Sequence, residues 1–356
     1  MLSYLKEHIK CKKEINVVYL GGSITEGAGA SMSTCRWSSM IHRWFQETYP
    51  MIQWNEYNAG IGGTNSEFGI FRLDSDVLIH NPDLVFVEFA VNDYNVDREQ
   101  VLDAMEEIVR RIRNKFPKCE IIFIITATMD MERTYYSLGM TPESVQIHDE
   151  VAEYYGIPSI HVGEVLLERI RNEKVDSKEY FIDGVHPNNK GYQQYFETIK
   201  EYLSIALKEE KEEKVNAVMP DYIGSGKYKN ARMIDARKNA DTAFCKEGIS
   251  LYRRYQGYIS SNVPGTKGSL EFEGTGIGVY WSISCDSGIL AFRIDGGEVQ
   301  EVSSWDKHAL NFDRCNHQML VSGLEYGKHK LQFWVSDKKD EKSFGNFVRI
   351  AAFLIL

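Results

Sequence analysis

Hydrophobic residues follow two different patterns along this chain. In the first two hundred residues, continuous apolar runs such as INVVYL (15–20), LVFVEFA (84–90) and EIIFIIT (120–126) alternate with segments of helical periodicity. Such runs are typical of parallel strands buried on both faces. Weaker strands are expected at 52–58 and 157–162, and helices at 36–48, 67–80, 98–116, 142–155, 163–173 and 189–208. This alternation predicts βαβ units, and hence a mostly parallel sheet covered by helices on both faces.

The pattern changes after a charged stretch, LKEEKEEKVN (207–216). From about residue 217 onward, short alternating runs are separated by turn signals such as DGG, EYGK and SDKKD. The runs are SLEFEG, IGVYWSIS, LAFRIDG, HKLQFWVS and FVRIAAFLIL. Short strands separated by turns predict an all-β sandwich of the jelly-roll type. We therefore predict two domains, residues 1–214 and 215–356.

The stretch VVYLGGSITEGAGA (17–30) places a serine, Ser23, among glycines just after the first apolar run. A phosphate-binding P-loop does not fit, because Ala28 stands where that loop needs its lysine. The glycine spacing also misses the dinucleotide fingerprint, and Thr25 breaks the G-x-S-x-G elbow. Open α/β sheets bind ligands at the carboxyl ends of their strands, so Ser23 is a candidate nucleophile that needs a base.

That base is expected in FIDGVHPNNKGY (181–192), just before the last predicted helix. Asp183 and His186 are three residues apart, which lets the carboxylate accept a hydrogen bond from the imidazole and leave the other ring nitrogen free. Taken alone, such a pair before a helix is more often only turn and capping chemistry, and Asn188 is the expected helix cap.

Two further polar stretches follow the second and third predicted strands. They are NAGIGGTNS (58–66) and FAVNDYN (89–95). Carboxyl ends of parallel strands share one edge of a sheet, so both stretches are expected near Ser23. Gly63 can offer a backbone N–H, and Asn92 a side-chain amide, to a developing oxyanion. We expect Asp93 to be structural.

Together these stretches resemble the SGNH hydrolase superfamily, also called the GDSL esterases and lipases. Its four blocks occur in order as GGSIT, NAGIGG, AVND and DGVH, within residues 14–207. The resemblance implies a flavodoxin-like α/β/α fold with five parallel strands. It also implies that Ser23 is the nucleophile, His186 the general base and then acid, and Asp183 the residue that orients His186. The N–H groups of Ser23 and Gly63 and the side chain of Asn92 would form the oxyanion hole.

The chain departs from the family pattern at two positions. Gly22 replaces the usual aspartate before the nucleophile, and Ala90 replaces the usual glycine two residues before Asn92. Gly60 and Gly62 are alternative N–H donors, although the offset from Asn58 favours Gly63.

Members of this superfamily with an added β-sandwich look like carbohydrate acetyl esterases. The resemblance therefore implies a serine esterase that removes short acyl groups, above all acetyl, from a small-molecule or oligosaccharide ester, without a metal or organic cofactor. An acyltransferase, a lipase or thioesterase of the same superfamily, and a non-catalytic carbohydrate-binding protein remain alternatives. Arg36 and Trp37 are weaker candidates for substrate binding, because helix opening and packing are commoner roles for them. Trp281, Trp305 and Trp334 could stack on sugars with Tyr252, Tyr255 and Tyr258, although most are expected in the core.

Charge and cysteine content limit the expected binding partners and cellular compartment of the protein. The formal net charge of −10 argues against nucleic acid and anionic membranes as partners, because both require a basic face. The six cysteines include no CxxC pair and predict reduced thiols rather than a disulfide framework or a zinc site. No apolar run is long enough to cross a membrane, so we expect a soluble cytoplasmic protein. The sequence leaves homo-oligomerisation open.

Overall fold

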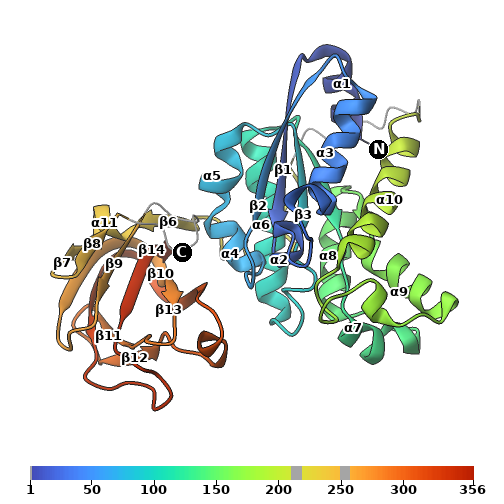
Figure 1. The fold of residues 1–356 in the computed structure, drawn as a ribbon. Helices are drawn as coiled ribbons and strands as arrows, with labels where there is room; N and C mark the ends of the chain where they lie inside the picture. Colours follow the sequence, from blue (N-terminus) through green and yellow to red (C-terminus); the bar gives the residue numbers. More distant parts are fainter. Residues whose placement is uncertain (1, 210–218, 249–256) are drawn as a thin grey trace. The chain divides into compact units, whose positions relative to one another are not determined.

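The computed structural model describes residues 2–209, 219–248 and 257–356 (Figure 1). The chain divides into two compact units, Met1–Lys227 and Tyr228–Leu356. The predicted boundary between residues 214 and 215 lies outside the described residues. No helix in the described ranges combines the length and apolar character needed to span a bilayer.

The first unit is built on a five-stranded parallel sheet with the order β2-β1-β3-β4-β5. The strands are β1 (Glu14–Gly21), β2 (Gln53–Gly60), β3 (Leu84–Glu88), β4 (Glu120–Ile124) and β5 (Ser159–Ile160). Every residue of β3 is buried, as the unbroken apolar run predicts for a central strand. The strand order is that of the flavodoxin-like fold, and the predicted α/β class is confirmed.

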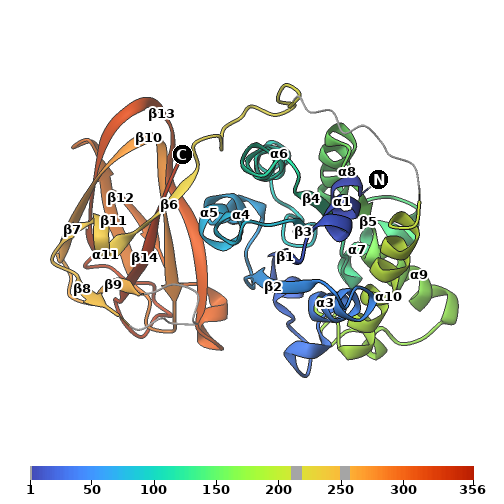
Figure 2. The same ribbon diagram turned by 90° about the horizontal axis from the view of Figure 1, so that it is seen from above.

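Helices cover both faces of this sheet, with α3 and α10 on one face and α4, α6 and α8 on the other (Figure 2). The helices are α1 (Ser3–Cys11), α2 (Ser23–Glu26), α3 (Trp37–Thr48), α4 (Ser66–Phe71), α5 (Leu73–Asp76), α6 (Arg98–Lys115), α7 (Met129–Thr134), α8 (Glu143–Tyr155), α9 (Val162–Glu173) and α10 (Asn189–Ala206). Asn188 caps α10, because its side chain accepts hydrogen bonds from the N–H groups of Lys190 and Gly191. The predicted start of the last helix is confirmed.

The single helix predicted at 67–80 is wrong, because the chain breaks there into α4, α5 and a short 3-10 turn (Leu78–His80). The break occurs at Arg72, whose side chain is almost fully buried. Its guanidinium donates to the carbonyl of Ala59 at 2.6 Å and to that of Gly21 at 3.1 Å. Both carbonyls lie at the carboxyl ends of strands, so Arg72 satisfies polar groups on which the site depends.

The second unit is an antiparallel β-sandwich. Its strands are β6 (Arg232–Asp235), β7 (Asp241–Thr242), β8 (Cys245–Glu247), β9 (Tyr258–Ser261), β10 (Lys267–Ile283), β11 (Ile289–Ile294), β12 (Gln300–Ser303), β13 (Arg314–Val335) and β14 (Val348–Ile355), with one short helix, α11 (Ala236–Asn239). The first half of β10 pairs with β7 and the end of β13, and its second half pairs with β14 and the start of β13. The two long strands therefore pass through both layers, and the predicted all-β domain is confirmed.

Two of the turns and strands predicted in this unit differ from the structure. SLEFEG and IGVYWSIS form one strand, β10, and the predicted turn EYGK lies inside β13. The pairing of the two strands shifts register between Gly274 and Gly276, where the partner residue changes from Gly327 to Ser322. The extra residues form a bulge that bends the ladder without ending it. The turn-like composition of EYGK therefore corresponds to a bend within β13 and not to a turn between two strands.

Candidate active site

Four segments meet at the carboxyl edge of the parallel sheet. Ser23 follows β1, Gly63 follows β2, Asn92 follows β3, and His186 lies in the loop before α10. Ser23 and His186 are 163 residues apart in sequence, yet the His186 Nε2 atom lies 2.8 Å from the Ser23 Oγ atom. The topology of the sheet thus brings distant residues to one point.

His186 is held from its other side by Asp183. The Nδ1 atom of His186 lies 2.7 Å from Asp183 Oδ2, and Asp183 Oδ1 accepts from the N–H groups of Val185 and His186 at 2.9 and 2.8 Å. Gly184 has a φ of 83°, a left-handed conformation that suits glycine and closes this tight loop. The hydroxyl, the imidazole and the carboxylate therefore form one continuous chain of hydrogen bonds.

The same hydrogen bonds set the charge of Asp183. Burial would raise the pKa of this carboxyl, but the bonds from His186 and Val185 outweigh burial and lower its pKa below the usual value. The carboxylate is ionised at neutral pH and can stabilise a protonated imidazole. The side chains of His186 and Asp183 are 25% and 48% exposed, so the site opens to solvent.

The three glycines after β2 differ in what their N–H groups contact. Gly60 donates to Asn58 Oδ1 at 3.1 Å, and Gly62 donates to Glu26 Oε2 at 2.7 Å. Among the described residues, the N–H of Gly63 has no acceptor. Its φ of 71° is again left-handed. Of the three, Gly63 is the one whose N–H is available to an anion.

Asn92 lies against the backbone just before the nucleophile. A Cβ atom on Gly22 would come within 1.9 Å of Asn92 Oδ1, so any larger residue there would require this amide to move. The Asn92 Oδ1 atom is buried and has no hydrogen-bond partner in the part of the chain that is described. The amide is therefore not committed to a structural bond through that atom.

Comparison with known proteins agrees with this geometry. Residues 19–194 match the model of the GDSL-like Lipase/Acylhydrolase family. The first unit belongs to this family. The acylhydrolase is accordingly a carboxylic ester hydrolase, and the match spans all four segments of the site.

Two solved structures resemble this chain over nearly its whole length. One is a two-domain esterase (CEX) active on acetylated mannans, which is 21% identical, with a TM-score of 0.84 over 100% of this chain and 95% of that one. The other is the same kind of esterase co-crystallised with mannopentaose, also 21% identical with a TM-score of 0.84, over 99% and 94% of the two chains. At this identity the likeness shows that the two-unit fold is shared. No curated protein sequence matches the acylhydrolase.

A buried carboxylate supports the turn that carries Ser23. Glu88, at the end of β3, is fully buried and accepts from the hydroxyls of Thr25 and Thr126 at 2.8 and 2.7 Å. Burial raises the pKa of Glu88 to about 7, although these threonines and the N–H groups of Thr25 and Gly22 oppose the increase. Glu88 thereby ties the turn that carries Ser23 to the ends of β3 and β4.

A second buried network joins the two oxyanion-side loops. Asp93 Oδ1 accepts from the N–H and the hydroxyl of Ser66 at 3.0 and 2.9 Å, and Asp93 Oδ2 lies 2.8 Å from His148 Nε2. The side chains of Asp93 and His148 are both fully buried. The predicted structural role of Asp93 agrees with these contacts, which hold the loop of Gly63 beside that of Asn92.

The two weaker substrate-binding candidates already have partners within the protein. Trp37 is fully buried, with its ring edge-on to Tyr19 and Phe86. A side chain without exposed surface cannot contact a substrate, so the prediction for Trp37 is not supported. The guanidinium of Arg36 contacts Ser39 and Glu56 at 2.8 and 3.2 Å, so its charge is already paired.

Sequence reasoning missed the supporting acids Glu26 and Glu88. A glutamate inside the apolar run LVFVEFA was a usable signal for Glu88, because a charged residue in a buried strand needs partners. Nothing in the local sequence points from Glu26 to Gly62. Over residues 2–209, 219–248 and 257–356, no group of three or more His, Cys, Asp and Glu side chains is placed to hold a metal ion.

Glu88 predicts a specific pH dependence of stability. Its pKa of about 7 in the folded state exceeds its unfolded value, so between about pH 4.5 and 7 the folded state retains a proton that the unfolded chain has lost. The free energy of unfolding should fall as pH rises through this window, by roughly 3 kcal/mol at most. Glu88→Gln removes this ionisation. The free energy of unfolding of the variant, measured by urea denaturation, should therefore decrease less between pH 5 and pH 8 than that of the wild type.

The control is Glu153→Gln, which removes an exposed glutamate on α8 and should retain the wild-type pH profile. Equal pH dependence in wild type and Glu88→Gln would show that Glu88 does not carry the proton.

Proposed function

We propose that this protein hydrolyses short-chain acyl esters, chiefly acetyl esters, on oligosaccharides, through an acyl-enzyme formed on Ser23. The observation that carries the proposal is the chain of hydrogen bonds from Ser23 Oγ to His186 at 2.8 Å and from His186 to Asp183 at 2.7 Å. A serine hydroxyl is a weak nucleophile until a correctly oriented base removes its proton, and this arrangement supplies that base.

In the proposed reaction, Ser23 Oγ attacks the ester carbonyl while His186 Nε2 takes the hydroxyl proton. The N–H groups of Ser23 and Gly63 and the amide of Asn92 donate to the oxyanion of the tetrahedral intermediate. The intermediate collapses when His186 returns the proton to the departing alcohol oxygen. Water, deprotonated by His186, then attacks the acyl-enzyme, and the carboxylic acid leaves while Ser23 regains its proton. Asp183 stabilises the imidazolium in both halves.

Two features favour a bulky carbohydrate alcohol. The side chains of His186 and Asp183 are 25% and 48% exposed, which leaves the site open to a large alcohol. The similar two-domain esterase is described as active on acetylated mannans, which supports a carbohydrate alcohol.

A cytoplasmic location is part of the proposal. All six cysteines are free thiols, and Cys11 and Cys245 are exposed. Exposed thiols persist in reducing compartments and tend to pair in oxidising ones. The substrate would then be an oligosaccharide rather than an extracellular polymer.

Replacement of the nucleophile tests the mechanism. Ser23→Ala should lower kcat for p-nitrophenyl acetate by a factor on the order of 10⁴ or more, because covalent catalysis is lost. It should also abolish labelling by a fluorophosphonate, while the thermal unfolding midpoint changes little. Ser33→Ala, on an exposed serine nearby, is the matched control and should leave rate and labelling intact. Wild-type turnover in Ser23→Ala would refute the acyl-enzyme.

Asn92 tests the oxyanion hole separately. Asn92→Ala should reduce kcat by about 10²–10³, the usual cost of one lost oxyanion donor. The fold should persist, because the Asn92 Oδ1 atom has no partner in the described residues. Fluorophosphonate should still label Ser23, more slowly. A variant with unchanged kcat would remove Asn92 from the proposed hole.

Acyl and alcohol preference test the substrate class. We expect kcat/KM for p-nitrophenyl esters to fall from acetate to octanoate, and acetate to be released from acetylated manno- or xylo-oligosaccharides. Preference for octanoate would contradict the acetyl assignment. Product analysis with free sugar acceptors distinguishes the outcomes further, since transfer of the acyl group to sugar in place of free acetate would identify an acyltransferase.

A further inference from the structure

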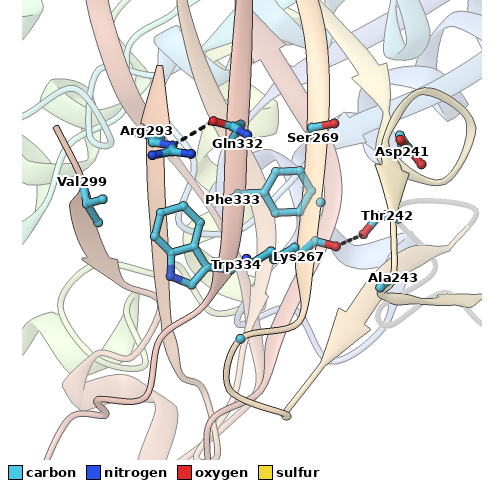
Figure 3. Close-up of a pocket in the computed structure, with 12 residues that line it drawn as sticks. Asp241, Thr242, Ala243, Lys267, Ser269, Arg293, Val299, Gln332, Phe333 and Trp334 are labelled. Atoms are coloured by element: carbon cyan, nitrogen blue, oxygen red, sulfur yellow. Dashed lines mark hydrogen bonds between the residues drawn. The ribbon is translucent and has the colours of Figure 1, made fainter. Parts of the chain in front are cut away.

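The second unit carries a cavity of about 600 Å³ on one face of its sandwich, within the range of ligand sites (Figure 3). Side chains that line it include Asp241, Lys267, Ser269, Arg293, Gln332 and Trp334. These residues belong to four neighbouring strands, β7, β10, β13 and β11. We name this surface the β-groove.

We propose that the β-groove is a second carbohydrate-binding site, which holds a neutral oligosaccharide chain. The proposal rests on the proposed function in one respect: the chain bound here would be the kind of sugar whose ester Ser23 hydrolyses. The two sites are chemically independent, because no residue of the β-groove belongs to the hydrolytic machinery.

Strand register explains why these side chains share a face. Gln332 pairs with Arg293 on one side and Ser269 on the other, and Ser269 pairs in turn with Asp241. Trp334, two residues along β13 from Gln332, points to the same side of the sheet. Phe333 between them is fully buried in the core. The alternation thus separates a packed inner face from a polar and aromatic outer face.

Trp334 provides the apolar surface of the β-groove. It is only partly buried, and its cross-strand neighbours are Ala291 and Lys267. Within the described residues, its indole pairs with no other ring and its N–H has no acceptor. A flat indole beside a small alanine can pack against the C–H face of a sugar ring, with its N–H left for a hydroxyl.

The polar side chains around Trp334 supply both donors and acceptors. Arg293 Nε donates to Gln332 Oε1 at 2.8 Å, which holds the two planar groups side by side (Figure 3). In the described part of the chain, the remaining N–H groups of Arg293 and the amide N–H groups of Gln332 have no acceptor. Asp241 is exposed and forms no ion pair there, so its carboxylate can accept from sugar hydroxyls.

Charge and length favour a neutral sugar chain over other ligands. Lys267 and Arg293 line the β-groove together with Asp241, so it lacks the single-sign charge that nucleic acids or polyanions require. Sugar hydroxyls both donate and accept hydrogen bonds, which matches the mixture of donors and acceptors that lines the β-groove. From β11 to β7 the face spans three strand spacings, about 14 Å, which accommodates several consecutive sugar rings.

Binding of unacetylated sugars to the full-length protein tests the β-groove. We expect mannopentaose or xylopentaose to bind in calorimetry and to change tryptophan fluorescence. Trp334→Ala should weaken binding at least tenfold, Trp334→Phe should weaken it less, and Gln332→Ala should also weaken it. Phe344→Ala removes a side chain that is 76% exposed outside the β-groove and should bind normally. All four variants should hydrolyse p-nitrophenyl acetate at the wild-type rate.

Three results would overturn the proposal: no binding of either neutral sugar by the wild type, wild-type affinity in both Trp334→Ala and Gln332→Ala, or binding of oligogalacturonate alone. Failure of the proposed function has a separate signature, which is the absence of acetate release from acetylated oligosaccharides whatever the binding result. If acetate is released while the variants bind sugar normally, only the β-groove is refuted.

Discussion

The hydrogen bond between His186 and Ser23 depends on nearly every other feature of the first unit. It joins two residues 163 positions apart, so it exists only when β1 lies inside a sheet whose carboxyl edge also receives the loop before α10. Parallel strands provide such an edge, because all of them end on the same side. The loop of Asp183 then needs a left-handed glycine, Gly184, to bend the carboxylate back onto its own imidazole.

Buried polar groups keep that edge in place. Arg72 satisfies the carbonyls of Gly21 and Ala59 at the ends of β1 and β2, while Glu88 holds the turn of Ser23 from below. Asp93 links the loops after β2 and β3 through Ser66. Each group is costly to bury without its partners. The stability of the unit and the geometry of the candidate active site therefore rest on the same contacts.

The second unit is built around two long bent strands. Its long strands, β10 and β13, bend through bulges so that one continuous ladder forms two layers around a common core. The outer face near Trp334 carries polar and aromatic side chains that are not part of this core. One unit thus supplies chemistry at strand ends, and the other presents a broad sheet face.

Much of this protein follows from local sequence. Unbroken apolar runs identify the strands of the first unit, because a central parallel strand is buried on both faces, and short alternating runs identify the sandwich. Residue chemistry also singled out Ser23, Gly63 and Asn92 after predicted strands. It singled out Asp183 and His186 in the loop before the last helix. Contacts between segments far apart in the chain could not be predicted from the local sequence. The burial of Trp37, the break at Arg72, the support from Glu26 and Glu88, and the bulge at EYGK each depend on a partner far along the chain. The local sequence pattern shows which residues of a segment are buried and which face solvent. Only the tertiary structure determines which side chain, carbonyl or ring each buried residue contacts.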